Sequence, residues 1–329
     1  MKVIIEKECW TCDDAEWRAD LVGLLDALRV HKQHSVQTRV DSLKEWCVEE
    51  APSLLGSLLG RVNQSQPRAD AVELRVHPDG VESVEHDPPW RLHAKTAASL
   101  VRQPLQLYLE NVKNDANFLR AVLPELAQWE SAKLLKLEHG GGSDMTTTIK
   151  DVALNGAARW RTFFLFDSDR LHPDELAPGW SAPSRDGCEG WQMHQALENA
   201  KMPPSRRHQL NRRSIENYLP QSLLSQRDAT RAEALHSSAV GRMSWFFNMK
   251  KGFQHDLFIK GDPERPNHIR AARSRGFWTS LPEEIQAALR QGFGDDVATL
   301  FPQVPPDHAW PPDVRDEVAK LHIALLDAL

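Results

Sequence analysis

The stretch Phe163-Phe164-Leu165-Phe166-Asp167-Ser168-Asp169-Arg170 decides how this chain of 329 residues is interpreted. Its four consecutive apolar residues predict a strand buried on both faces, as in parallel sheets that helices cover. Two acids follow at once, and no apolar contact accounts for them. Ligands of open parallel sheets bind at the carboxyl ends of the strands. Asp167 and Asp169 are therefore candidate site residues, placed to share a divalent cation.

Strands and helices are expected to alternate from about residue 105 onward, which indicates an α/β region with a parallel sheet and crossover helices. The expected strands cover residues 105–109, 133–137 and 163–166, and the expected helices cover 115–128, 146–159 and 192–201. Beyond residue 219 the chain is predicted to be mostly helical, and a final amphipathic helix follows Pro311-Pro312.

The first hundred residues carry a different pattern, which we interpret as α+β. Apolar residues at helical spacing predict a first helix capped by Asp13 or Asp14, at Trp17, Leu21, Leu24, Leu25 and Leu28. A second helix is expected over 40–59. The turn sequence Pro78-Asp79-Gly80 between two alternating runs predicts a hairpin. This part shows no catalytic constellation, so we expect it to serve as a partner interface.

The composition limits the class of protein. With 40 Lys and Arg against 46 Asp and Glu, the net charge is −6, so a nucleic acid must be bound by a local basic surface. No run approaches the roughly 20 apolar residues of a membrane span, and a soluble, cytoplasmic protein without a membrane partner is expected. Cys9 and Cys12 form a C-x-x-C without a second pair, which favours reduced thiols over a zinc or redox site.

Acids end two of the expected strands. Glu110 follows 105–109 and Asp167 follows 163–166, while Gly140-Gly141-Gly142 follows the strand between them. Parallel strands present their carboxyl ends at one edge, so these elements should converge on one site. Carboxylates gathered in this way raise one another's pKa unless cations neutralise them, which favours Mg²⁺ or Mn²⁺.

These elements resemble a known family. Glu110, the glycine turn and Asp167-Ser168-Asp169 resemble the TOPRIM domain of topoisomerases, primases and certain nucleases. The run from Arg212 to Leu219 contains Ile-Glu-Asn-Tyr-Leu and is similar to a segment of the overcoming-lysogenization-defect (OLD) type antiphage nucleases. Asn248-Met249-Lys250-Lys251-Gly252 resembles the lysine-glycine element of those proteins. The similarity covers residues 105 to 285.

The resemblance implies a TOPRIM-like parallel sheet and two divalent ions, Mg²⁺ or Mn²⁺. Their ligands would be the five acids Glu110, Asp115, Asp167, Asp169 and Glu216. Lys251, or Lys250 beside it, would neutralise charge on the reacting phosphate. Alternatives without a catalytic role stay open for these residues. Asp115 departs from the family's spacing and could be a helix N-cap. Glu216 could be a surface acid, and the lysine pair could be a solvated helix end.

Nucleic-acid contacts are expected from the basic segment containing Arg206, Arg207, Arg212 and Arg213. Arg270, Arg273 and Arg275 form a weaker candidate, because a solvated helix face has the same pattern. We therefore divide the chain into an amino-terminal domain (1–100), a TOPRIM-like catalytic domain (101–225) and a mostly helical extension that contributes the lysine (226–329).

The resulting hypothesis is a metal-dependent endonuclease acting on DNA or RNA, the effector of an antiphage system. The chain lacks the P-loop motif G-x-x-x-x-G-K-[ST], so a separate ATPase or sensor protein is the expected partner, and a homo-oligomer stays open. Two alternatives remain: phosphotransfer of the primase or topoisomerase kind, and a non-enzymatic binding protein stabilised by a metal ion. The sequence does not separate DNA from RNA, including transfer RNA, as the substrate.

Overall fold

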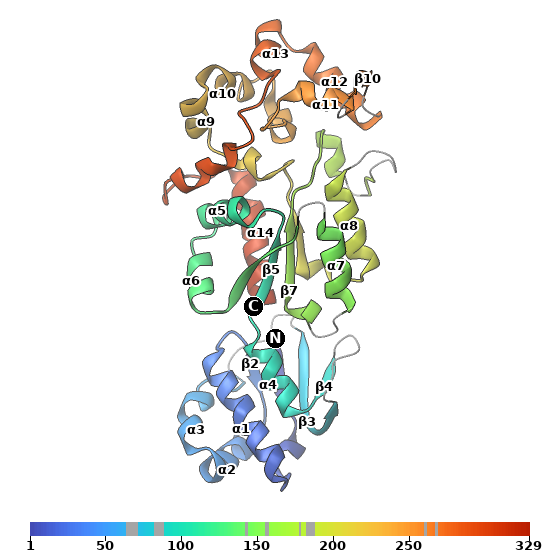
Figure 1. The fold of residues 1–329 in the computed structure, drawn as a ribbon. Coiled ribbons are helices and arrows are strands. Elements are labelled where there is room, and N and C mark those ends of the chain that lie inside the picture. Colours follow the sequence, from blue (N-terminus) through green and yellow to red (C-terminus); the bar gives the residue numbers. More distant parts are fainter. Residues whose placement is uncertain are drawn as a thin grey trace.

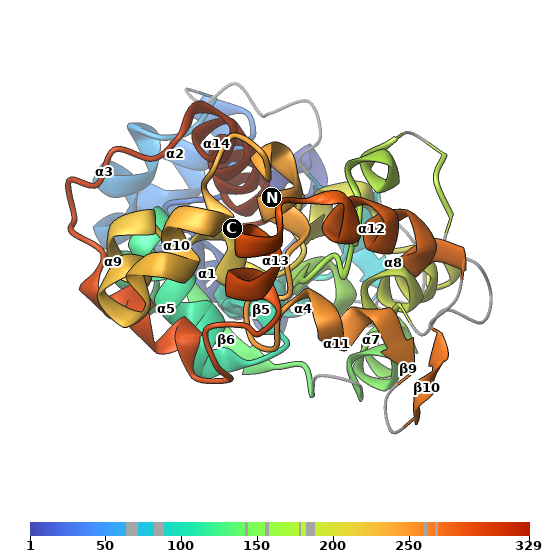
Figure 2. The ribbon, with the colours of Figure 1, turned by 90° about the horizontal axis from the view of Figure 1, so that it is seen from above.

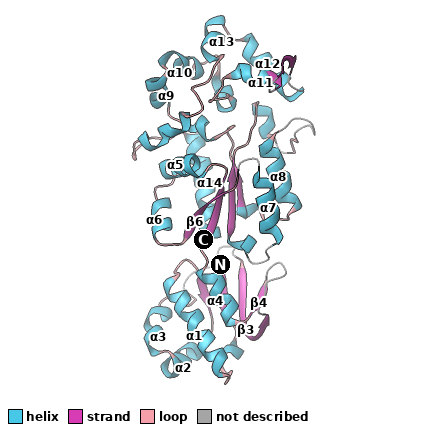
Figure 3. Cartoon of the chain, in the orientation of Figure 1, coloured by secondary structure: helices cyan, strands magenta, loops and turns pink. Residues whose placement is uncertain are grey.

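The computed structural model describes residues 1–63, 72–81, 89–141, 144–154, 158–177, 179–181, 188–259, 262–266 and 269–329. In this part of the chain two parallel four-stranded sheets are each flanked by helices, and a helical region follows them. The first sheet lies at one end of the molecule, the second in the middle and α9 to α13 at the other end (Figures 1 and 3).

The first sheet has the strand order β2-β1-β3-β4, and all its pairings are parallel. Its strands are β1 (Lys2–Ile5), β2 (Ser35–Gln37), β3 (Glu73–Val81) and β4 (Trp90–Leu92). The helices of this region are α1 (Ala15–Val30), α2 (Val40–Glu50), α3 (Pro52–Leu59) and α4 (Ala94–Arg102), with a 3₁₀ turn η1 (Lys7–Trp10). The amino-terminal region is thus parallel α/β, which corrects the α+β expectation.

The predicted hairpin is wrong. The sequence Pro78-Asp79-Gly80 lies within β3, which pairs in parallel with β4, and the register shifts so that Val76 and Val81 both oppose Leu92. A Cβ on Gly80 would lie 2.2 Å from the Leu92 carbonyl carbon. The residue that suggested a turn is therefore a glycine that lets two backbones approach closely.

The first helix is confirmed, and the second is broken. Asp14 caps α1, because its side chain accepts a hydrogen bond from the Trp17 amide at 2.8 Å. The expected helix over 40–59 is two helices, since Pro52 has no N–H to continue α2 and begins α3 instead.

The second sheet has the strand order β6-β5-β7-β8, again all parallel. Its strands are β5 (Leu105–Leu109), β6 (Leu135–His139), β7 (Thr162–Phe166) and β8 (Arg207–Gln209). The helices around it are α5 (Val112–Val122), α6 (Leu126–Ser131), α7 (Met145–Leu154) and α8 (Glu189–Asn199), and the 3₁₀ turns are η3 (Ala158–Arg161), η4 (Pro173–Leu176) and η5 (Pro204–Arg206). The predicted alternation of strands and helices is confirmed.

Both faces of β7 are covered, which explains its uninterrupted apolar run. Phe164 and Phe166 pack with residues of α7 and α8, including Met145 and Met193. Phe163 and Leu165 face the opposite core, which α5 and α14 share. The chain therefore leaves the sheet at Asp167, where the covered strand ends.

Helices dominate the rest of the chain. They are α9 (Gln221–Arg227), α10 (Ala229–Leu235), α11 (Phe253–Leu257), α12 (Ile269–Ser280), α13 (Glu283–Leu289) and α14 (Pro312–Ala328), with the 3₁₀ turns η6 (Ile215–Tyr218), η7 (Gly241–Phe246) and η8 (Val297–Gln303) and the strand pair β9 (Phe258–Ile259) and β10 (Asp262–Pro266). Figure 2 shows α9 to α13 from above. Within the described residues, no helix has the length and apolar character needed to cross a membrane.

The apolar core has two main bodies. One gathers residues from Met1 to Val101, and the other runs from Leu105 to Leu329. Helix α14 contacts β7 and so returns to the second sheet. The carboxyl-terminal helices thus share the core of the second sheet, and the domain boundaries stay predictions.

Candidate metal centre

Two acids meet where neighbouring strands end. Strands β5 and β7 pair in parallel with Leu109 opposite Leu165, so Glu110 and Asp167 leave the sheet at the same edge. The backbone N–H of Asp167 donates to Glu110 Oε1 at 2.8 Å. The predicted convergence of these strand ends is confirmed.

Asp115 joins this edge from the first turn of α5. The N-cap of α5 is Asn111, whose side chain accepts from the Asn114 amide at 3.1 Å. The Asp115 carboxylate turns back and accepts the Asn111 amide at 2.8 Å. The capping alternative for Asp115 is therefore wrong: the cap is Asn111, and the buried Asp115 side chain lies against the end of β5.

The segment around η6 brings a further acid to the same place. The Ile215 amide donates to Asp167 Oδ1 at 3.1 Å, which ties the start of the turn to the end of β7. Ser214 and Asn217 form a capping box around η6. The Asn217 amide group also donates to the carbonyl oxygens of Ser244 and Phe247, at 3.1 and 3.0 Å. The turn is thus braced internally by its capping box and is held to β7 and to the segment around η7 by hydrogen bonds.

Tyr218 anchors the other end of the turn to α14. Its hydroxyl donates to Glu317 Oε2 at 2.7 Å and accepts the Arg212 amide at 3.2 Å. Glu317 Oε1 accepts the Asn211 amide at 2.7 Å. The apolar Ile215 is buried in the same core, so the Glu216 carboxylate between these anchors has little freedom to move away.

Glu216 is a buried acid and not a surface residue. Its side chain is 2% exposed, and Oε1 lies 2.9 Å from Lys250 Nζ. The other oxygen, Oε2, is buried without a hydrogen-bond partner among the described residues. An unsatisfied buried carboxylate oxygen is costly, so this atom is a candidate ligand for a cation.

The structure distinguishes Lys250 from Lys251, which were equal candidates for the lysine of the site. Both lysines are exposed, but the Lys250 side chain reaches Glu216, whereas Lys251 uses its backbone N–H to donate to Asn248 Oδ1 at 3.0 Å. The Phe293 amide donates to the Met249 carbonyl at 2.6 Å, and the Gly294 amide donates to that of Lys250 at 3.1 Å. These bonds hold the turn so that Lys250 alone of the pair faces the acids.

Asp169 is held differently from the other acids. Its φ is +52°, in the left-handed region that aspartate tolerates better than most residues. Its Oδ2 accepts the Gly190 amide at 2.8 Å, at the start of α8. A Cβ on Gly190 would lie 2.5 Å from the Ser168 carbonyl oxygen and 2.6 Å from that of Asp167. Glycine is therefore required where α8 packs on the acidic loop.

The acids shift one another's protonation. Burial, with the charge of Asp169 nearby, raises the pKa of Glu110 to about 8. Burial, with the charge of Glu216, raises the pKa of Asp115 to about 7. Burial of the carboxyl group, together with the charges of Glu110 and Glu216, raises the pKa of Asp167 well above the usual range. Without added cations, this edge holds protons near neutral pH.

Lys250 supplies part of the compensating charge. Burial lowers the pKa of its ammonium, but the charges of Glu216, Asp167 and Asp115 outweigh burial and raise that pKa overall. One lysine does not neutralise three or more acids. The orphaned Glu216 oxygen and the raised carboxyl pKa values fit a divalent cation with oxygen ligands.

The carboxylates at this sheet edge are near one another, but their oxygen atoms are not close enough to surround one metal ion as they stand. Within the described residues, three candidate ligand atoms lie within 4.8 Å of one another at Glu6 and Glu8, which follow β1, and at His77 in β3, and not at this edge. His77 Nδ1 accepts the Asp79 amide at 3.0 Å, which leaves the proton of a neutral ring on Nε2. His77 is thus a poor ligand in this arrangement.

The four predicted phosphate-binding arginines make contacts within the protein. Arg206 is 2% exposed, and Arg207 pairs with Glu198. Arg212 lies 2.8 Å from Asp313, and Arg213 binds both oxygens of Asp256 at 2.5 and 2.9 Å. The structure therefore does not bring these side chains together as one exposed basic surface. The side chains of Arg270 and Arg273 lie outside the described residues.

Several residues that support the site escaped the sequence analysis, namely Asn111, Gly190, Asp256 and Glu317. Only Asn111 carried a local signal, since asparagine before a helical pattern is a common N-cap. The others act on the site from distant parts of the chain.

Cys9 is buried, which raises the pKa of its thiol to about 12, and all four cysteines are free thiols.

Comparison of the chain with protein-family models, curated proteins and solved structures gives no match. The geometry of the site therefore has to be interpreted on its own.

Proposed function

We propose that this protein is a divalent-metal-dependent nuclease that hydrolyses phosphodiester bonds of DNA or RNA. The observation that carries the proposal is the cluster of acids Glu110, Asp115, Asp167 and Glu216, of which Asp115 and Glu216 are buried. They come from three separate parts of the chain and meet at one sheet edge beside Lys250. Isolated buried carboxylates cost stability, so their accumulation favours a site that binds cations.

The proposal includes a TOPRIM-type assignment for the second sheet and a relationship to the OLD-type nucleases. Contacts between the elements that carry the resemblance support this assignment. Glu110 contacts the Asp167-Ser168-Asp169 loop, this loop contacts the η6 turn, and the η6 turn contacts the lysine turn. On this proposal the protein acts in the cytoplasm as an antiphage effector, with a separate ATPase or sensor as its partner.

The residues have distinct parts in the proposed reaction. Asp167, Glu216, Glu110 and Asp115 would hold one or two Mg²⁺ or Mn²⁺ ions, and Asp169 would complete the shell while it fixes the loop on α8. Bound ions would activate a water and stabilise the leaving oxygen of the phosphodiester. Lys250 is the cation beside these acids, and it would bind a phosphate oxygen as negative charge develops. Lys251 has no such part.

One observation separates this proposal from covalent phosphotransfer. The chain has two tyrosines. Tyr108 lies within β5 and stacks on Phe164, and the buried Tyr218 hydroxyl is bound to Glu317. Neither side chain is arranged as a nucleophile. Hydrolysis by water is therefore the version that we propose.

Expression in bacterial cells tests the proposal, with total DNA and RNA examined for cleavage. Wild-type protein should degrade one of them, and Asp167→Asn should not. Glu130→Gln is the matched control, because Glu130 pairs with Arg120 at the surface of another helix, and it should retain wild-type activity. Cleavage by Asp167→Asn at the wild-type rate would refute the proposal. The nucleic acid that is cut identifies the substrate.

A metal-stabilised binding protein is the second candidate, and the absence of a closed ligand set among the described edge residues favours it. It predicts ion binding without cleavage in the same experiment.

A further inference from the structure

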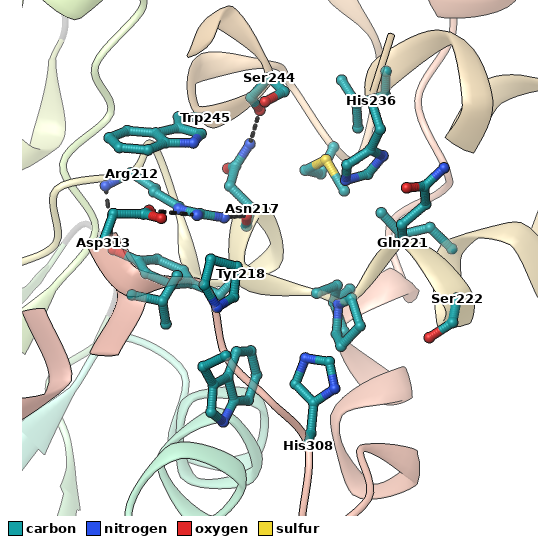
Figure 4. A pocket seen from close by; sticks show the side chains of 18 of the residues that line it. Arg212, Asn217, Tyr218, Gln221, Ser222, His236, Ser244, Trp245, His308 and Asp313 are labelled. Atoms are coloured by element: carbon teal, nitrogen blue, oxygen red, sulfur yellow. Dashed lines mark hydrogen bonds and ion pairs between the residues drawn. The ribbon is translucent and has the colours of Figure 1, made fainter. Parts of the chain in front are cut away.

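A pocket of about 480 Å³ lies beside the η6 turn, between η6, α9, η7 and the chain that enters α14 (Figure 4). This volume falls within the roughly 300 to 1,000 Å³ of small-molecule sites. Asn217 and Tyr218 line the pocket and directly follow Glu216, while Met249 lines it and directly precedes Lys250. The pocket and the carboxylates are therefore built on the same two segments.

The charges of the pocket cancel. Of the residues that line it, Arg212 and Asp313 carry permanent charges, and their side chains pair at 2.8 Å. Arg212 also donates to the Asn217 carbonyl oxygen at 2.5 Å. The guanidinium is thus occupied by the protein, and the lining favours an uncharged polar ligand over a phosphate group.

Flat aromatic groups make up much of the wall: Tyr218, Trp245, His308 and Trp310. The His308 and Trp310 rings stand at 90° with their centroids 4.6 Å apart. The Arg212 guanidinium lies 4.9 Å from the ring centres of both Tyr218 and Trp245, which fixes these two rings. His308 and Trp310 are partly exposed, and rings of this kind suit a flat aromatic ligand, since stacking on an aromatic side chain is favourable for any base.

Polar groups lie on the side of α9 and α10. Gln221 and Ser222 are exposed at the first turn of α9, and His236 follows α10 (Figure 4). His236 Nδ1 lies 2.9 Å from the Ala232 carbonyl oxygen, which only accepts, so Nδ1 donates and Nε2 of the neutral ring is an acceptor. An amide, a hydroxyl and an imidazole acceptor together match the mixed donors and acceptors of a nucleobase edge.

We propose that this pocket binds one unpaired nucleobase of the nucleic acid that is cut at the neighbouring carboxylates. The inference rests on the proposed nuclease function and adds a substrate class to it: single-stranded nucleic acid, or a duplex with an extruded base. The base would stack on the aromatic wall while its phosphate stays outside the neutral pocket.

The test uses full-length Asp167→Asn protein in EDTA, so that no cleavage occurs. Binding of a fluorescein-labelled single strand of about twelve nucleotides is measured by anisotropy. Ser222→Trp should fill the pocket and weaken binding about tenfold or more, as expected for loss of one stacked base. Gln226→Trp places the same side chain on the same helix away from the pocket and should leave binding unchanged. Equal binding by both variants would overturn the inference.

A competition experiment needs no further substitution. Adenosine should displace the labelled strand, whereas inorganic phosphate at the same concentration should not. Failure of adenosine, displacement by phosphate alone, or absence of single-strand binding would each overturn the inference. The nuclease proposal is judged separately, because wild-type cleavage that depends on Asp167 can stand even if the pocket binds no base. Base binding without such cleavage would instead remove the nuclease proposal.

Discussion

Lys250 Nζ lies 2.9 Å from Glu216 Oε1, while Glu216 Oε2 is buried without a hydrogen-bond partner in the described part of the chain. The lysine comes from the carboxyl-terminal region and the glutamate from the turn that follows β8. This pair connects the two parts of the proposed active site. It leaves one carboxylate oxygen for another cation, and it is the reason why we propose Lys250 and not Lys251 as the catalytic lysine.

The first prediction contrasts these lysines. Lys250→Ala should lower the cleavage rate by about 100-fold or more, because it removes a cation positioned for transition-state charge. Lys251→Ala should retain near wild-type cleavage and change stability by less than about 0.5 kcal/mol, as is usual for exposed side chains. Initial rates and thermal melts of the two variants check this. Equal losses of activity would show that Lys250 is not distinguished from its neighbour.

The second prediction concerns stability without metal ions. The charges of Glu110 and Glu216 surround Asp167, so Asp167→Asn relieves repulsion while its Oδ1 can still accept the Ile215 amide. In EDTA at about pH 8, the free energy of unfolding of the variant should equal or exceed that of wild type, with an expected gain of about 1 kcal/mol. Adding Mn²⁺ should raise the melting temperature of wild type only. A variant that is clearly less stable in EDTA would contradict the repulsion argument.

The third prediction is a pH dependence. The pKa values of Glu110 and Asp115 are raised to about 8 and about 7, so between roughly pH 4.5 and 8 the folded state holds protons that the unfolded chain releases. The free energy of unfolding in EDTA should therefore fall as the pH rises through this range. Urea denaturation should give a shallower fall for Glu110→Gln than for wild type. An identical fall in both proteins would exclude Glu110 as a contributor.

The fourth prediction tests how α8 positions the acids. Gly190→Ala would force its methyl group into the Ser168 and Asp167 carbonyl oxygens, and it should cost about 2 kcal/mol or more and reduce Mn²⁺ affinity. Gly56→Ala is the control, because nothing lies within 4 Å of its added Cβ, and it should stabilise α3 by about 0.5 to 1 kcal/mol. A neutral Gly190→Ala would show that the loop adapts to the added methyl group.

Part of this arrangement follows from local sequence. The apolar run of β7 and the acids after β5 and β7 place Glu110 beside Asp167, because parallel neighbours end at the same edge. In the first sheet the same kind of reasoning failed. Pro78-Asp79-Gly80 has the composition of a turn, but whether such a glycine makes a turn or lets strands approach depends on a partner strand that the local sequence does not reveal.

The rest depends on contacts between distant residues. Lys250 and Lys251 are equivalent in the sequence, and the turn in which Lys250 reaches Glu216 is held by hydrogen bonds from the distant residues Phe293 and Gly294. The arginines near residue 210 appeared free to bind phosphate. Their partners Asp256 and Asp313 lie 43 and 101 residues further along the chain, where no local pattern could indicate them.

The central claim is that the acids at the edge of the second sheet bind divalent cations. Calorimetric titration of the full-length protein with Mn²⁺ at about pH 8 tests it most directly, because neither substrate nor partner is required. Wild type should show saturable binding, which Asp167→Asn abolishes and Glu130→Gln preserves. Equal Mn²⁺ binding by wild type and Asp167→Asn, or no binding by wild type, would contradict the account.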